Sequence, residues 1–352
     1  MSQRQDRSLP RICLDVMGSD YGPEQLVLGA FSFLKSNGKR LGKLILVGDE
    51  TVLTPLLAKA DSKIAGLLEV VHASQVIAMD EKPMQTLKHK KDASMFKAID
   101  LVHTGEADAV LSCGNTGSLM AGSTLKLRTI SGVDRPALAS VIPTRANRFV
   151  LLDIGANPNT SVQHLVHNAI LGSHFASAVL QKSRPSVGLL TIGTEEGKGT
   201  DKVQQTHECL KQLSNDSFNY KGLIEGFDLF EDAVDVVVCD GFVGNILLKT
   251  CESLFFNLKD FLKTEYKRSL VRKLGALLSV GVFRQMKQQF APEKFSGAPL
   301  LGLNGWVFKS HGSSKAAAIA GALGMCLDCL EVYDLQAIQA DIIRANRVIE
   351  GL

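Results

Sequence analysis

The stretch VLLDIGAN at residues 150–157 joins a continuously apolar run to a polar turn that contains glycine and asparagine. Two later runs, VGLLTI at 187–192 and VDVVVC at 234–239, are almost as apolar. Strands that are buried on both faces, as in a parallel sheet covered by helices, have this character. These three segments therefore predict central strands of an α/β protein.

Similar short runs alternate with longer stretches of helical spacing, such as 24–36 and 162–179. This alternation predicts a doubly wound α/β/α sandwich. We expect a flexible lead at residues 1–10 and a single α/β domain at 11–352. The predicted strands are 12–16, 44–47, 68–72, 109–112, 137–142, 149–154, 187–192, 220–224 and 234–239.

The composition is that of an ordinary globular protein, with 352 residues, 45% hydrophobic and 21% charged. A net charge of +3 gives no reason to expect a nucleic-acid partner. The seven cysteines are scattered, which favours reduced thiols in the cytoplasm. The first ten residues lack the apolar segment of a secretory signal, and no apolar run is long enough to span a bilayer.

Five apolar runs end in polar, glycine-containing turns. They are VMGSD at 16–20, LSCGNTGS at 111–118, LLDIGANPN at 151–159, LTIGTEEGKG at 190–199 and VVCDGFVGN at 237–245. Ligands of open α/β sheets bind at the carboxyl ends of strands, so these turns predict one shared crevice. For any single turn, the alternative is that glycine and asparagine only form a tight connection.

Several familiar chemistries lack their motifs. The dinucleotide fingerprint G-x-G-x-x-G is absent, and the turn from Gly193 to Lys198 is too short for an ATP-binding loop. That turn can still present amides and a cation to a phosphate. Cys326 and Cys329 have no second pair of zinc ligands nearby, and there is no G-x-S-x-G elbow. We expect no metal and no cofactor.

The motif HGSS at 311–314 precedes an alanine-rich helical stretch, which places a serine at a natural N-cap beside His311. A helix start with glycine and histidine predicts an anion site; ordinary capping is the alternative.

The C-terminal third contains a predicted helix at 246–266 and a basic, amphipathic segment at 266–292. That segment carries no acidic residue before Glu293 and six basic ones: Lys267, Arg268, Arg272, Lys273, Arg284 and Lys287. Contact with a membrane surface and packing against a second subunit both fit this pattern. Two helices are predicted within 313–352.

Eight motifs in order resemble the bacterial PlsX-type phosphate acyltransferases. They are DVMGSD at 15–20, LKHKKDASM at 87–95, SCGNTGSLM at 112–120, GVDRPAL at 132–138, LLDIGAN at 151–157, IGTEEGKG at 192–199, DGFVGNILLK at 240–249 and HGSS at 311–314. The first motif departs from the usual family pattern, because Ser19 replaces a glycine and Tyr21 follows the aspartate.

The resemblance implies an isocitrate-dehydrogenase-like, phosphotransacetylase-like fold and a homodimer. It implies transfer of an acyl group from acyl carrier protein to inorganic phosphate, at an anionic membrane surface, in phospholipid synthesis. A downstream glycerol-3-phosphate acyltransferase would take the product. A helical hairpin at about 246–292 would supply a dimer stem and a membrane tip formed by Leu270, Leu274, Leu277, Leu278, Val282 and Phe283.

Attack of phosphate on a thioester requires positioning, anion binding and oxyanion donors, but no strong base. The motif positions expected to act in catalysis are Lys198, Asn245, His311 and Asp240. Those expected to bind substrate or phosphate are Asp15, Gly18, Asn115, Thr116, Gly117, Asp153, Asn157, Glu195, Gly241, Gly244 and Ser313. Asp153 and Asp240 are also expected to orient neighbouring groups.

The acidic carrier protein is expected to dock on Lys88, Lys90 and Lys91, for which a solvated charge run is the alternative. Two other functions stay open. One is a phosphotransacetylase that uses a short acyl-CoA, and the other is a non-enzymatic membrane scaffold for lipid-synthesis enzymes.

Overall fold

The computed structural model describes residues 9–351 except 196, 215–217, 291–296 and 333. Residues 1–8 of the predicted lead and the last two residues of the predicted hairpin lie outside the described part. Eleven strands form one sheet in the order β3-β2-β1-β4-β11-β10-β5-β6-β9-β7-β8. Their bounds are β1 Arg11–Asp15, β2 Lys43–Gly48, β3 Leu68–His72, β4 Ala109–Ser112, β5 Ala137–Pro143, β6 Arg148–Leu152, β7 Ser186–Leu190, β8 Asn219–Ile224, β9 Val236–Val238, β10 Ala298–Leu301 and β11 Trp306–Lys309.

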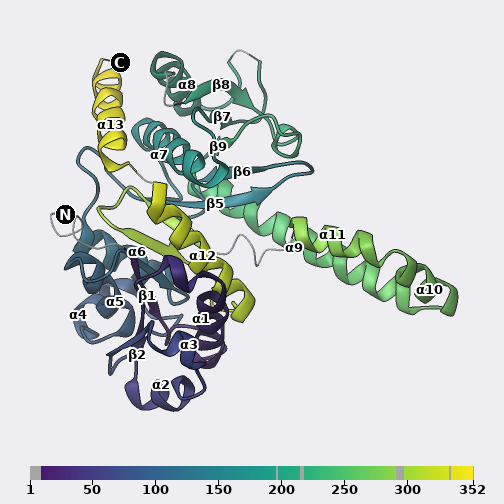
Figure 1. Ribbon diagram of the computed structural model, residues 1–352. Coiled ribbons are helices and arrows are strands. Elements are labelled where there is room, and N and C mark those ends of the chain that lie inside the picture. The colour runs from purple at the N-terminus through teal and green to yellow at the C-terminus, as the bar shows by residue number, and fades with distance from the viewer. Residues whose placement is uncertain (1–8, 196, 215–217, 291–296, 333, 352) are drawn as a thin grey trace.

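Helices cover both faces of this sheet (Figure 1). They are α1 Pro23–Asn37, α2 Glu50–Leu57, α3 Ser62–Ala65, α4 Pro83–His89, α5 Ser94–His103, α6 Thr116–Leu127, α7 Val162–Leu180, α8 Asp201–Leu213, α9 Gly241–Lys267, α10 Leu270–Leu278, α11 Val280–Phe290, α12 Ala316–Val332 and α13 Leu335–Glu350. The predicted α/β sandwich is therefore confirmed.

The sheet is mixed, which corrects the expectation of a parallel one. β5 pairs antiparallel with β6 and β10, and β10 pairs antiparallel with β11. These three reversals make β6, β9 and β7 run opposite to β1, β4 and β11. The carboxyl ends in the two halves of the sheet therefore do not share one edge, and another element must connect them.

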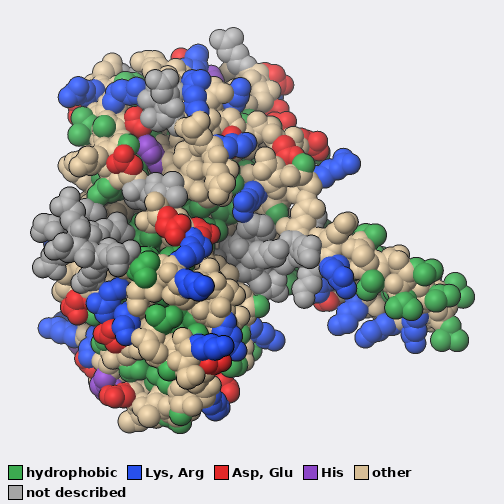
Figure 2. All heavy atoms as spheres, in the orientation of Figure 1, with side chains coloured by type: hydrophobic (Ala, Val, Ile, Leu, Met, Phe, Trp, Pro, Cys, Tyr) green, Lys and Arg blue, Asp and Glu red, His purple; other side chains and the backbone are tan. Residues whose placement is uncertain are grey.

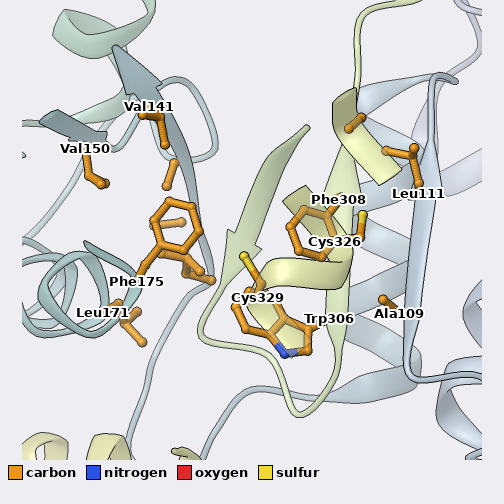
Figure 3. Close-up of a cluster of buried hydrophobic side chains, with 14 of the residues drawn as sticks. Ala109, Leu111, Val141, Val150, Leu171, Phe175, Trp306, Phe308, Cys326 and Cys329 are labelled. Atoms are coloured by element: carbon orange, nitrogen blue, oxygen red, sulfur yellow. The ribbon is translucent and has the colours of Figure 1, made fainter. Parts of the chain in front are cut away.

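The core runs across both halves of the sheet. Figure 3 shows Phe175 of α7 near Val141 and Val150 on one side, and Trp306 and Phe308 of β11 near Cys326 and Cys329 of α12 on the other. Phe175 and Phe308 are fully buried. Because one apolar cluster joins α7 to α12, the two halves fold around a common interior.

The helix α9 begins at the end of β9 and extends well beyond the body (Figure 1). It starts at Gly241, five residues before the predicted start. α10 and α11 fold back along it to form the predicted hairpin, and Tyr266 packs edge-on against Phe283 with ring centroids 5.3 Å apart. Apolar side chains gather at the far end of this hairpin, with basic side chains along one edge (Figure 2).

No single helix among the described residues is long and apolar enough to cross a membrane. Only α12 and α13 taken together, bent by 78°, reach the necessary length and composition.

Candidate functional site

The first turn of α9 presses against the loop at 153–157. A β-carbon added at Gly244 would lie 1.9 Å from the carbonyl oxygen of Asp153, and one at Gly241 would lie 2.7 Å from that of Asn157. Asp240 caps the helix, since its Oδ1 accepts from the Val243 amide at 2.9 Å. The glycines of this motif therefore allow the backbone of α9 to approach the backbone of the 153–157 loop more closely than any residue with a side chain would. We call residues 240–245 the α9 turn.

The carboxylate of Asp153 is fully occupied by its own loop and by the start of β5. Its Oδ1 accepts from the amides of Leu138, Gly155 and Ala156, and its Oδ2 from the amide and side chain of Asn157. The Asn157 side chain also donates to the Pro136 carbonyl at 2.8 Å. Both residues are buried and shape the loop that receives α9. Their predicted contact with substrate and the predicted orienting role of Asp153 both stay untested.

Asn245 lies above Gly155, where a β-carbon would be 3.5–3.8 Å from the asparagine side chain. It is exposed, and its side chain makes no hydrogen bond to any described residue. The Lys202 ammonium lies 3.8 Å from Asp240 Oδ2 and 3.4 Å from the Thr160 hydroxyl. The α9 turn thus presents a free amide with a loosely held cation nearby. The sequence reasoning missed Lys202, because it follows the glycine-rich motif.

The glycine-rich turn after β7 holds Lys198 and Glu195 on its exposed side. A β-carbon at Gly193 would lie 2.6 Å from Glu195 Oε2 and 3.2 Å from Lys198 Cγ. The Lys198 backbone donates to Glu195 and accepts from the Gln204 side chain. The Lys198 ammonium has no partner among the described residues and is free to meet an anion. The roles of Lys198 and Glu195 remain predictions.

A second cluster lies where β1, β4 and β11 end. Asp15 is buried and accepts from the hydroxyls of Ser94 and Ser112, each at 2.7 Å. Burial raises the pKa of this carboxyl above its ordinary value, against the effect of the two serines. A β-carbon at Gly18 would lie 2.7 Å from the Gly114 α-carbon, so the motifs at 15–20 and 112–120 are in contact through their glycines.

Lys309 ends β11 inside this cluster. Its ammonium donates to the Cys113 carbonyl at 3.0 Å and to the Ser310 carbonyl. Burial lowers the pKa of this lysine, while the charge of Asp15 favours the ammonium form. Lys309 was not predicted, because the strand that carries it lacks a strong apolar run.

Asn115 caps α6 and ties the neighbouring loop in place. Its Oδ1 accepts from the Ser118 amide, and its side-chain amide donates to the carbonyls of Met79 and Glu81. Thr116 and Gly117 form the first turn of α6, and Pro83 packs against Gly117. The side chain of Asn115 is therefore committed to its own loop, although a substrate role for these three residues stays untested.

Residues 310–315, here the 311 loop, follow β11. The Gly312 carbonyl accepts from the Asp20 amide at 2.9 Å and the Ser19 hydroxyl at 3.0 Å. The predicted serine cap of the next helix is wrong: α12 begins at Ala316, and Ser314 bonds the Ser310 hydroxyl at 2.8 Å. Both hydroxyls are buried, so they satisfy each other. Ser313 is exposed, and its predicted role stays untested.

His311 reaches α9. Its Nε2 lies 3.2 Å from Glu252 Oε1, and this bond to His311 holds the pKa of Glu252 below its ordinary value against the effect of burial. α9 therefore joins the α9 turn, in one half of the sheet, to the 311 loop, in the other. Nothing in the sequence marked Glu252, because the pairing depends on how α9 crosses the sheet.

The three lysines predicted to dock the carrier protein differ in their exposure and in their partners. Lys88 and Lys91 are exposed at the end of α4. The Lys90 ammonium pairs with Glu81 at 2.5 Å and donates to the Val76 carbonyl at 2.6 Å. Lys90 is thus engaged within the chain and less available to a partner.

Within the described residues, no group of three or more His, Cys, Asp or Glu side chains could hold a metal ion.

Comparison with known proteins identifies the family. A model described as "Fatty acid synthesis protein" matches residues 10–331. A curated "Phosphate acyltransferase" of Methylococcus capsulatus is 41% identical over 91% of this chain and 93% of its own length. A second curated "Phosphate acyltransferase", from Halorhodospira halophila, is 41% identical over 97% of this chain and 98% of its own length. The chain belongs to the phosphate acyltransferase family. The family resemblance seen in the sequence is therefore confirmed.

The solved structures that resemble this chain include proteins named phosphotransacetylase and phosphotransacylase. A phosphotransacetylase from Staphylococcus aureus superposes with a TM-score of 0.60 at 16% identity, covering 92% of this chain and 94% of its own. A branched-chain phosphotransacylase from Enterococcus faecalis superposes with a TM-score of 0.57 at 15% identity, and the match covers 92% of this chain and 100% of that protein's chain. At these identities the likeness concerns the fold, and it confirms the predicted phosphotransacetylase-like architecture.

Proposed function

We propose that this chain is a phosphate acyltransferase that moves an acyl group from acyl carrier protein to inorganic phosphate, yielding acyl phosphate and free carrier protein. Curated relatives at 41% identity over most of the chain carry that enzyme name. The family description, fatty acid synthesis, supports a carrier-bound acyl donor. In this reading the product serves phospholipid synthesis.

One observation carries the proposal most directly. The α9 turn is built around two glycines that admit no side chain, and among the described residues it leaves the Asn245 amide unpaired. The Lys202 ammonium lies 3.8 Å from Asp240 at the start of the same turn. Such a site can donate hydrogen bonds to an anion without competition from internal acceptors. Lys198, which also lacks a partner among the residues that the structure describes, adds a second cation on the turn after β7.

The chemistry needs few proton transfers. An oxygen of phosphate attacks the thioester carbonyl carbon and forms the new C–O bond. The tetrahedral oxyanion then collapses, the C–S bond breaks, and the thiolate of the carrier's prosthetic group leaves. Asn245 and Lys198 would stabilise the phosphate and the oxyanion, and Asp240 would hold the helix start in place.

We propose further that two copies of the chain pair along α9. Leu254, Leu258 and Phe261 are exposed on this helix, and Ile246 and Leu254 line a shallow groove with Thr250 and Asn257. Apolar side chains left in water along several helical turns favour burial against a partner. The homodimer predicted from the family resemblance would cover them.

The tip of the hairpin is proposed to touch an anionic membrane surface from the cytoplasm. The four leucines of α10 are 58–83% exposed, and Arg272 and Lys273 stand among them. Val282 of α11 is also exposed, whereas Phe283 is half-buried against Tyr266 and contributes less. A surface position would deliver acyl phosphate to a membrane acyltransferase that acts on glycerol 3-phosphate.

Two assays separate this function from its alternatives. The purified protein is incubated with a long-chain acyl carrier protein and labelled phosphate, or with acetyl-CoA and labelled phosphate. We expect acyl phosphate in the first reaction at a much higher rate than acetyl phosphate in the second. Preference for acetyl-CoA would support a phosphotransacetylase, and no product in either would support a scaffold. Either result overturns the proposal.

A further inference from the structure

The contact between Glu252 and His311 joins two elements that are remote in the fold. Glu252 lies on α9, in the third helical turn after the start, and His311 follows β11 in the opposite half of the sheet. The His311 Nε2 and Glu252 Oε1 are 3.2 Å apart. The carboxylate side chain is 25% exposed and the imidazole 59%. The bond is therefore partly shielded from solvent on the carboxylate side.

The backbone of the 311 loop is fixed without Glu252. Ser19 and Asp20 bind the Gly312 carbonyl, and the Ser314 amide donates to the His311 carbonyl at 3.0 Å. None of these bonds holds the imidazole. Among the described residues, Glu252 is the polar side chain that orients the ring.

The charged groups around the ring define its electrostatic setting. Glu252 Oε2 faces Lys249 at 3.6 Å from the same helix, so one carboxylate oxygen serves the lysine and the other the histidine. From the loop after β1, the Asp20 carboxylate comes within 2.7 Å of a β-carbon built at Gly312. A neutral imidazole in this setting donates Nε2–H to Glu252 and leaves Nδ1 as the free acceptor.

The helix also sets the distance from His311 to the α9 turn. Asn245 and Glu252 are seven residues apart, hence on the same face of α9 and about 10 Å apart along its axis. A rigid helix therefore holds both the unpaired amide and the carboxylate that steers the imidazole.

We propose that Glu252 is a positioning residue: it holds His311 in the Nε2–H form, so that Nδ1 faces the reacting groups. This inference rests on the proposed function only where activity is measured, because the state of the imidazole can be observed without substrate.

The first test reads the imidazole directly. Nitrogen-15 spectra of histidine-labelled protein distinguish the two neutral forms of the ring, and the His311 signal is assigned with His311→Asn. We expect the Nε2–H form in the wild type, in Glu252→Gln, which keeps an acceptor oxygen, and in the matched control Lys249→Gln. Glu252→Ala should give a mixture of forms. An unchanged His311 signal in folded Glu252→Ala overturns the inference.

The second test is a double-mutant cycle on acyl phosphate formation. Glu252→Ala should lower kcat roughly tenfold to a hundredfold, a share of what a positioned acid or base contributes. In the His311→Asn background the same change should have little further effect, because Glu252 acts through the ring. Equal losses in both backgrounds would mean a structural role and contradict the proposal. If the wild type makes no acyl phosphate, the proposed function fails while the spectra still test the positioning.

Discussion

The carbonyl oxygen of Asp153 occupies the space that a side chain at Gly244 would need, with only 1.9 Å between them. This contact presses the start of α9 onto the loop at 153–157 and sets where Asn245 is displayed. Every role proposed for the α9 turn depends on that close approach.

Gly244→Ala is expected to be severely disruptive. The added methyl group would overlap backbone that cannot move away, so the variant should lose about 3 kcal/mol or more of unfolding free energy, together with its activity. Urea unfolding and the acyl phosphate assay measure both losses. Gly275→Ala is the control, because its added β-carbon has no described atom within 4 Å apart from its chain neighbours and the adjacent backbone of α10, and α10 should gain about 0.5–1 kcal/mol from the alanine.

Lys198→Ala should reduce turnover by roughly 10²–10³ while the thermal midpoint stays near that of the wild type. The side chain is exposed and unpaired within the described residues, so its loss removes a cation from the site without disturbing packing. Lys221→Ala, at the exposed position of β8, is the matched control and should retain activity. Turnover equal to that of the wild type in Lys198→Ala would remove this lysine from the mechanism.

Asp15 should make stability depend on pH. Its folded-state pKa is raised by burial, so its contribution to stability is complete below the unfolded-state pKa and declines as pH rises through the folded-state value. Asp15→Asn keeps the shape of the side chain but cannot ionise, and one of its two acceptor oxygens becomes an amide donor to a serine hydroxyl. The unfolding free energy of this variant relative to the wild type should therefore increase between acidic and neutral pH. A difference that stays constant with pH would contradict the assignment.

The leucines of α10 should govern attachment to lipid. Replacing Leu277 and Leu278 with serine removes two side chains that are 68% and 81% exposed, so the fold should be unaffected. Each leucine buried in lipid contributes about 2 kcal/mol, and binding to anionic vesicles should fall at least about a hundredfold. Co-sedimentation measures this. Leu125→Ser, at a 52% exposed leucine on α6, should bind as the wild type does.

The pattern of apolar runs predicted nine of the eleven strands in the described part, because each lies in a largely apolar stretch of the sequence. β10 and β11 were missed. They have four residues each, separated by a turn at 302–305, and their place between β4 and β5 is fixed by packing of Trp306 and Phe308. Without them, the reversal of direction across the sheet could not be foreseen.

The motifs indicated which loops form the candidate site, but they could not show which of its side chains are available to a ligand. Asp153 and Asn115 have the residue types of ligand-binding groups, yet both are engaged by amides or carbonyls of nearby loops. The Asn245 side chain, in contrast, makes no hydrogen bond to any residue that the structure describes. The partners that complete the arrangement, Glu252 and Lys202, lie outside the motifs' polar turns, and only the path of α9 brings them in.

The central claim is that an oxygen of phosphate forms the new bond to the acyl carbon, and one isotope measurement tests it. The protein is incubated with a long-chain acyl carrier protein and phosphate carrying four oxygen-18 atoms, and the product is analysed by mass spectrometry. The account predicts acyl phosphate that retains all four labelled oxygens. Release of unlabelled fatty acid without acyl phosphate, as in hydrolysis by water, would contradict it.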